Sequence, residues 1–143
     1  MKYTLLCLVA LAVFGNAAFS QNKDPWSAGQ LMDPKVLSDK ISTHQTKDLL
    51  ILCVGPDALI KGSVDMGAAH EAVNLQKLKD HLKKAGKDKE VVIYCGCCPF
   101  DRCPNIRPAF QVLTEMGFKN AKLLNLSKNI RTDWLDKNYP VRE

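Results

Sequence analysis

Residues 90–117 read EVVIYCGCCPFDRCPNIRPAFQVLTEMG, and the rest of the chain is arranged around this stretch. Residues 90–94 are a short β-branched run without polar alternation, which predicts a buried central strand. Apolar residues then recur at helical spacing from Ile106 to Met116, and Gly117 is placed to end that helix. The cysteine-rich residues 95–103 are therefore predicted to be a loop that joins a buried strand to a helix.

Cys95 lies where the predicted strand ends. The amides of the loop and the N-terminus of the following helix can face its sulfur, and their partial positive charge favours the thiolate. We therefore predict that Cys95 is a reactive nucleophile. The alternative is a cysteine that is simply buried or held in a disulfide.

The other segments continue an alternation of strands and helices. Two more apolar runs predict buried strands, a proline after an aspartate predicts a helix start, and a weak glycine-containing segment predicts a loop with one short strand. These segments are residues 49–54 and 121–126 for the strands, a helix from Asp33-Pro34, the loop 57–72, a helix capped by Asn74, and a short helix holding Trp134. This alternation predicts an α/β fold whose central, mostly parallel sheet has helices on both faces.

The first 20 residues are typical of a secretory signal peptide. Lys2 precedes an apolar run over residues 3–15, and small residues follow before Gln21. The apolar run is too short to span a bilayer, so no stable membrane insertion is expected after cleavage. We expect an exported protein, periplasmic or secreted, with residues 21–29 as a flexible N-terminal arm and residues 30–143 as one domain. Trp26 is a possible anchor for that arm.

The basic balance of the chain does not indicate a nucleic-acid partner. The formal net charge is +5, but the lysines are scattered and no aromatic residues are interleaved with them. This pattern is typical of a solvated basic surface.

The remaining cysteines allow three interpretations. Export would place them in an oxidising compartment, and without Cys7 an odd number remains, so at least one stays unpaired in a monomer. We favour a disulfide between Cys103 and either Cys97 or Cys98, because the two adjacent cysteines would pair with strain. Alternatively, one of them resolves an intermediate on Cys95, or the loop thiolates bind zinc or copper(I). The spacing C-x-C-C-x4-C is not a standard zinc pattern, so no metal or cofactor is expected.

Several other residues are candidates near the cysteine loop. Gly96 and Arg102 belong to that loop, and Arg102 would stabilise the thiolate or an anionic substrate through charge-assisted hydrogen bonds. Arg107 stands at a helix start, where a cation opposes the helix dipole, so it is expected to meet an anion. Cys53 is expected to be a buried apolar cysteine, and His70 is a candidate to line the site.

The order of these parts resembles the rhodanese-like sulfurtransferase domain over residues 30–142. Residues 49–54 look like its first core strand, residues 61–68 (KGSVDMGA) its "GHIPGA" segment, and residues 91–95 (VVIYC) the strand that ends in its catalytic cysteine. Residues 109–118 and 122–124, with Trp134 and residues 139–141, resemble its helix, last strand and "W…GYPV" ending. The chain departs from the family at Cys53-Val54-Gly55, where Asp-Val-Arg is usual, and in a longer loop with three extra cysteines.

The resemblance implies a sulfurtransferase in which the Cys95 thiolate takes a sulfane sulfur from thiosulfate or a persulfide and passes it to a thiol or another nucleophile. The expected partners are therefore a small sulfur donor and a thiol acceptor. Two alternatives stay open. One is a thiol-disulfide oxidoreductase that uses Cys95 with the loop cysteines, and the other is a non-catalytic module that binds a metal or a protein.

Overall fold

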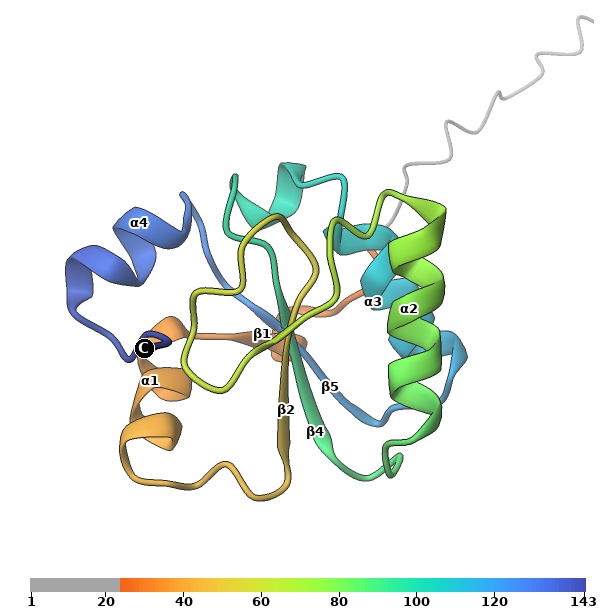
Figure 1. Ribbon diagram of the computed structural model, residues 1–143, viewed down its shortest axis with the longest axis horizontal. Coiled ribbons are helices and arrows are strands. Elements are labelled where there is room, and N and C mark those ends of the chain that lie inside the picture. The colour runs from red at the N-terminus through yellow and green to blue at the C-terminus, as the bar shows by residue number, and fades with distance from the viewer. Residues whose placement is uncertain (1–23) are drawn as a thin grey trace, which may run out of the picture.

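Five parallel strands form the centre of the protein, in the order β1-β5-β4-β2-β3 (Figure 1). The computed structural model describes residues 24–143, so the predicted signal peptide lies outside the described residues. Every pairing between neighbouring strands of the sheet is parallel. The strands are β1 (Leu31–Met32), β2 (Leu49–Cys53), β3 (Val64–Asp65), β4 (Glu90–Tyr94) and β5 (Asn120–Leu124). The predicted α/β fold with a parallel central sheet is confirmed.

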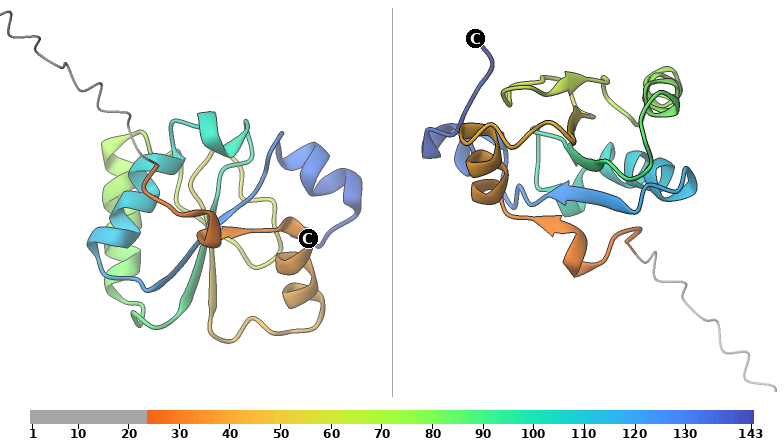
Figure 2. Two further views of the ribbon diagram at one scale, coloured as in Figure 1. Left: turned by 180° about the vertical axis from the view of Figure 1, so that it is seen from behind. Right: turned by 90° about the horizontal axis from the view of Figure 1, so that it is seen from below.

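Helices cover both faces of the sheet, as predicted. On one face α2 (Ala72–Lys83) and α3 (Ile106–Glu115) lie side by side, and on the other lie α1 (Pro34–Ser42) and α4 (Ile130–Asp133) (Figures 1 and 2). Two apolar cores result, one on each face. Short 3₁₀ helices complete the structure at Ala28–Gln30, Phe100–Arg102 and Leu135–Lys137.

The alternation of side chains along β4 decides which face receives Cys95. Val91 and Ile93 belong to the core under α2 and α3, whereas Val92 and Tyr94 belong to the opposite core. Because successive strand residues point to opposite faces, Cys95 continues the Val91 and Ile93 side. Its side chain therefore lies at the carboxyl edge of the sheet, beneath the start of α3.

The sequence signals for the start of α1 and the end of α3 are confirmed, whereas the signal for the start of α2 is not. Asp33 accepts the backbone N–H of Lys35 at 2.7 Å, with Pro34 in the first helical position, and α3 is followed by Gly117 at φ +78°. The prediction that Asn74 caps α2 was wrong, because the helix begins at Ala72 with Glu71 as its N-cap. The Asn74 amide instead donates to the Ala68 carbonyl at 3.1 Å and so holds the preceding turn.

The N-terminal arm is held by Trp26, as expected for an anchor. Its ring is buried and packs edge-on against Phe110 and Phe100, with centroids 5.7 and 6.1 Å away. Within residues 24–143, none of the helices has both the length and the apolar character needed to cross a membrane.

Candidate functional site

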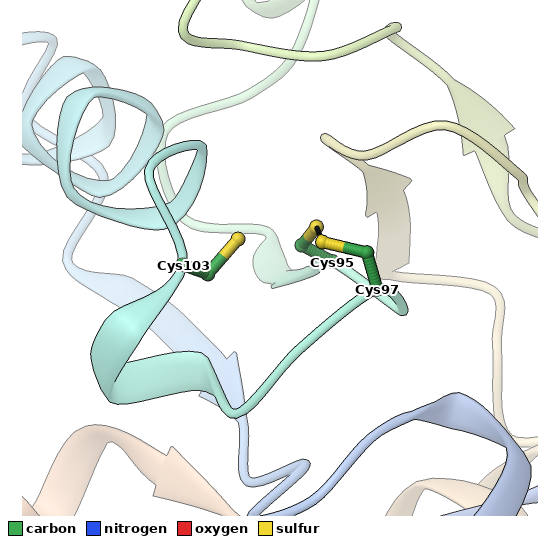
Figure 3. Close-up of side chains that lie close together, drawn as sticks. All are labelled: Cys95, Cys97 and Cys103. Carbon is green, nitrogen blue, oxygen red and sulfur yellow. Dashed lines mark hydrogen bonds between the residues drawn. The ribbon is translucent and has the colours of Figure 1, made fainter.

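Three cysteine sulfurs converge at the carboxyl edge of β4. The Sγ atoms of Cys95, Cys97 and Cys103 all lie within 4.8 Å of one another. Figure 3 shows the sulfur of Cys97 turned toward that of Cys95, with Cys103 approaching from the turn before α3. All five cysteines among the described residues are free thiols. The predicted disulfide of Cys103 stays a prediction, and the fold places this cysteine near both Cys95 and Cys97.

The cluster has a buried inner side and an exposed outer side. Cys103 is 0% exposed and Cys95 is 1% exposed, whereas Cys97 is exposed. The Sγ atoms of Cys95 and Cys97 are 3.3 Å apart, and those of Cys97 and Cys98 are 3.0 Å apart. The side of the cluster that faces solvent is therefore the side of Cys97.

Asn105 is a second polar group aimed at Cys95. Its side-chain oxygen accepts the backbone N–H of His70 at 3.0 Å and lies 2.7 Å from Nδ1 of the same histidine. With the oxygen held in this way, Nδ2 faces Cys95 and donates to its sulfur at 3.5 Å. Asn105 is the N-cap residue of α3 but makes no side-chain cap, because its amide is used in these contacts.

These donors make Cys95 unusually acidic. The hydrogen bond from the Cys103 thiol is the largest influence, and with the Cys97 backbone N–H, the Asn105 amide and the Cys97 thiol it outweighs burial. Together they lower the pKa of Cys95 to about 5, from an ordinary value of 9.0. At neutral pH the cluster therefore carries a thiolate at Cys95, stabilised by hydrogen bonds as expected for a reactive cysteine.

The other two sulfurs of the cluster keep their protons. The hydrogen bond that Cys103 donates to Cys95 is the main reason that the pKa of Cys103 is raised. Burial of the inward-turned sulfur, followed by its contacts with Cys98 and Cys95, raises the pKa of Cys97 to about 12. The site thus combines one thiolate with two neutral thiols that donate to it.

Gly55 makes room for the Cys95 sulfur. A Cβ atom at position 55 would lie 2.5 Å from Cys95 Sγ, a distance that no real contact tolerates. Glycine at position 55 therefore has a structural reason. The segment after β2 packs directly against the sulfur at the end of β4.

Gly96 fixes the path of the cysteine loop. Its carbonyl accepts the backbone N–H of Ile130 at 3.0 Å, and a Cβ atom there would lie 2.9 Å from the Cβ of Ile130. Farther along the loop, the backbone N–H of Phe100 donates to the Leu126 carbonyl at 3.1 Å. The loop is thereby tied to the segment between β5 and α4.

Among residues 24–143, no hydrogen bond joins either candidate arginine to a sulfur of the cluster. Arg102 is exposed at the end of the 3₁₀ helix that precedes Cys103. Arg107 contacts the Asp24 carboxylate at 2.6 Å and lies 5.4 Å from the centroid of the Trp26 ring. The anion that Arg107 meets in this structure is therefore a carboxylate of the N-terminal arm.

Cys53 is buried, as predicted, and lies on the opposite face of the sheet. It pairs in register with Tyr94, so it faces the core that contains Tyr94 and Trp134. Its thiol donates to the Asp57 carbonyl at 3.2 Å, and burial raises its pKa to about 11. Although β2 and β4 are neighbours, Cys53 is not part of the cysteine cluster.

Sequence reasoning missed two residues of this site, Asn105 and Gly55. Asn105 has a signal in the sequence, since asparagine immediately before a predicted helix is a capping residue, but that signal predicts a different role. His70 was a candidate, and the structure connects it to Cys95 through Asn105.

No protein-family model matches the chain, and no curated protein matches it. The fold and the site by themselves describe an α/β domain with a thiolate held at the carboxyl edge of its parallel sheet.

Proposed function

We propose that the protein is a rhodanese-like sulfurtransferase that moves a sulfane sulfur through a persulfide on Cys95. The observation that supports this most is the Cys95 thiolate, whose pKa of about 5 results from donors of the loop and of Asn105. A thiolate at neutral pH is the form that attacks a sulfur electrophile. The same donors would stabilise the terminal sulfur of a persulfide, which also carries negative charge.

In the loading step the Cys95 thiolate attacks the outer sulfur of thiosulfate. A new sulfur–sulfur bond forms on Cys95, the bond between the two sulfur atoms of thiosulfate breaks, and sulfite leaves with the electron pair. In the second step an acceptor thiolate attacks the outer sulfur of the persulfide, and the Cys95 thiolate is regenerated. A persulfide donor would follow the same course, with a thiolate leaving in place of sulfite.

Intact mass spectrometry of the reduced protein, cleared of reductant and mixed with thiosulfate, tests this proposal. We expect a gain of one sulfur atom, mapped to Cys95 and removed by cyanide as thiocyanate. Cys95→Ser is expected to reduce this gain to background, whereas Cys53→Ser, which alters a buried thiol on the other face of the sheet, is expected to retain it. Undiminished loading of the Cys95→Ser variant would overturn the proposal.

A second candidate is a thiol-disulfide activity, favoured by the distance of 3.3 Å between the sulfurs of Cys95 and Cys97. Here the Cys97 sulfur attacks the inner sulfur of the Cys95 persulfide. A Cys95–Cys97 disulfide forms and hydrogen sulfide leaves, so the sulfane sulfur is reduced and the two thiols are oxidised. A dithiol reductant would restore the thiols. Sulfide release with a matching loss of two thiols would favour this activity, and a stable persulfide would exclude it.

We also propose that the protein is exported, since residues 1–20 have the pattern of a signal peptide. Its partners would then be a small sulfur donor and a thiol acceptor outside the cytoplasm. The N-terminal sequence of protein isolated from the source cells tests this. A mature chain that begins near Gln21 is expected, and a chain that retains Met1 in a cytoplasmic fraction would contradict it.

A further inference from the structure

The cysteine cluster also has the composition of a metal site. Its three sulfurs come from separate parts of the fold, namely the end of β4, the loop that follows, and the turn before α3. No histidine or carboxylate of residues 24–143 belongs to this group. The donor set is therefore three sulfurs, which are soft ligands.

The distances between these sulfurs suit a single ion. Metal–thiolate bonds are about 2.3 Å long, so three sulfurs around a trigonal centre lie about 4.0 Å apart. The contact between Cys95 and Cys97 is 3.3 Å, and no sulfur–sulfur distance in the group exceeds 4.8 Å. Shifts of less than an ångström would therefore bring all three sulfurs to bonding distance from one ion.

The number and softness of the ligands select the ion. Zinc in a structural site takes four ligands, whereas this group supplies three sulfurs and does not include Cys98. Copper(I) prefers thiolates and accepts three of them. We propose that Cys95, Cys97 and Cys103 form a binding site for one copper(I) ion, an occupancy of the cluster that goes beyond sulfur transfer.

Binding needs no oxidant or reductant. Each of the three sulfurs coordinates as a thiolate, and any proton that it carries is released to solvent. The buried positions of Cys95 and Cys103 place the ion below the surface, and the exposed Cys97 provides its route from solvent. A bound ion would occupy the sulfur that sulfur transfer uses, so copper(I) and a persulfide on Cys95 exclude each other.

An anaerobic titration of the reduced full chain with copper(I), in competition with a colorimetric copper(I) chelator, tests the site. We expect one ion per chain. Loss of an outer-sphere partner typically weakens metal binding 10–100-fold, so Cys103→Ser and Cys97→Ser are expected to weaken it by at least about 100-fold. Cys97 is exposed, which makes its variant informative if the Cys103 variant fails to fold. The matched control Cys53→Ala, which removes a buried thiol on the other face of the sheet, is expected to keep the wild-type affinity.

X-ray absorption of the loaded protein gives an independent readout, with three sulfur neighbours expected around copper. Two sulfur neighbours, complete transfer of copper to the chelator, or an unchanged affinity of both serine variants would overturn the site. None of these readouts requires sulfur transfer. If the protein forms the persulfide normally but does not bind copper, the copper site alone is rejected. If it binds copper but forms no persulfide, the proposed function alone is rejected.

Discussion

Cys53 and Cys95 are two cysteines in nearly the same place with opposite chemistry. Each lies at the carboxyl end of a central strand, the strands β2 and β4 are neighbours, and the two residues are 0% and 1% exposed. Yet the pKa of Cys53 is raised to about 11 and that of Cys95 is lowered to about 5. Both thiols are buried, so burial alone does not explain the difference.

The difference comes from the hydrogen-bond donors on each face of the sheet. Burial raises the pKa of Cys53, and its hydrogen bonds with the Gly55 backbone and the Tyr94 side chain offset only part of that rise. The Cys95 sulfur accepts from the Cys103 thiol, the Cys97 backbone and the Asn105 amide, which favours the ionised form. A shift of one residue along the chain moves a cysteine to the other face, and there it meets a different set of partners.

The largest expected effect is on the pH dependence of alkylation. The thiolate is the reacting form, so the rate of Cys95 alkylation by iodoacetamide should be half-maximal near pH 5 and level by neutral pH. Alkylation of Cys53 should continue to rise toward pH 11. Peptide mapping after short pulses of reagent measures both residues in one sample. An alkylation midpoint for Cys95 at or above 9.0, the ordinary pKa of a cysteine thiol, would show that the donors around its sulfur do not make Cys95 more acidic.

The opposite pKa shifts of Cys95 and Cys53 should also make the free energy of unfolding depend on pH. Between pH 5 and pH 9 the unfolded chain keeps a proton on Cys95 that the folded chain has released, so stability should rise with pH across this window, by a few kcal/mol. Above pH 9 it should fall, because Cys53 and Cys97 keep protons in the fold that the unfolded chain loses. Urea unfolding of reduced protein measures both limbs.

Two alanine variants separate the rise in stability below pH 9 from the fall above it. Cys95→Ala should lose the rise between pH 5 and pH 9, and Cys53→Ala should keep it while showing a smaller fall above pH 9. An unchanged rise in Cys95→Ala would assign it to another group.

Removal of the Asn105 amide should reduce the difference between the pKa values of Cys95 and Cys53. Hydrogen bonds to charged groups contribute about 1.5–3 kcal/mol, so Asn105→Ala should raise the alkylation midpoint of Cys95 by about 1–2 pH units. Asn105→Asp should raise it further, because a carboxylate would face the thiolate. Asn120→Ala, an exposed asparagine at the start of β5, is the control and should leave the midpoint in place. Equal midpoints for all three variants would show that Asn105 does not act on Cys95.

A change at Gly55 should have the smallest effect of the four. Gly55→Ala places a methyl group 2.5 Å from the Cys95 sulfur, so the sulfur or the segment after β2 must move, at a cost of about 1–3 kcal/mol. Gly86→Ala, where no atom lies within 4 Å of the added Cβ, should leave stability nearly unchanged. Thermal unfolding of both variants measures the difference, and equal stabilities would show that the sulfur relocates freely.

Much of the fold was predictable because its signals are local. The β-branched run of residues 90–94 matches β4, Asp33-Pro34 begins α1, and Gly117 follows the end of α3. The start of α2 was misplaced because Asn74 resembles a cap, while its side chain is used in a turn that precedes the helix. Patterns among consecutive residues predict helices and strands well, but they do not show which hydrogen-bond partner a polar side chain has in the folded protein.

The sequence by itself determined that Cys95 ends a buried parallel strand and that further cysteines follow in one loop, because strand and helix periodicity are properties of consecutive residues. Only the tertiary structure decided that Cys103 and Asn105 turn back to Cys95, that Gly55 makes room for its sulfur, and that Cys53 faces away. The physical reason is that the acidity of a thiol depends on the donors within a few ångströms of its sulfur. Those donors come from segments that only the packing of β2, β4 and α3 brings together.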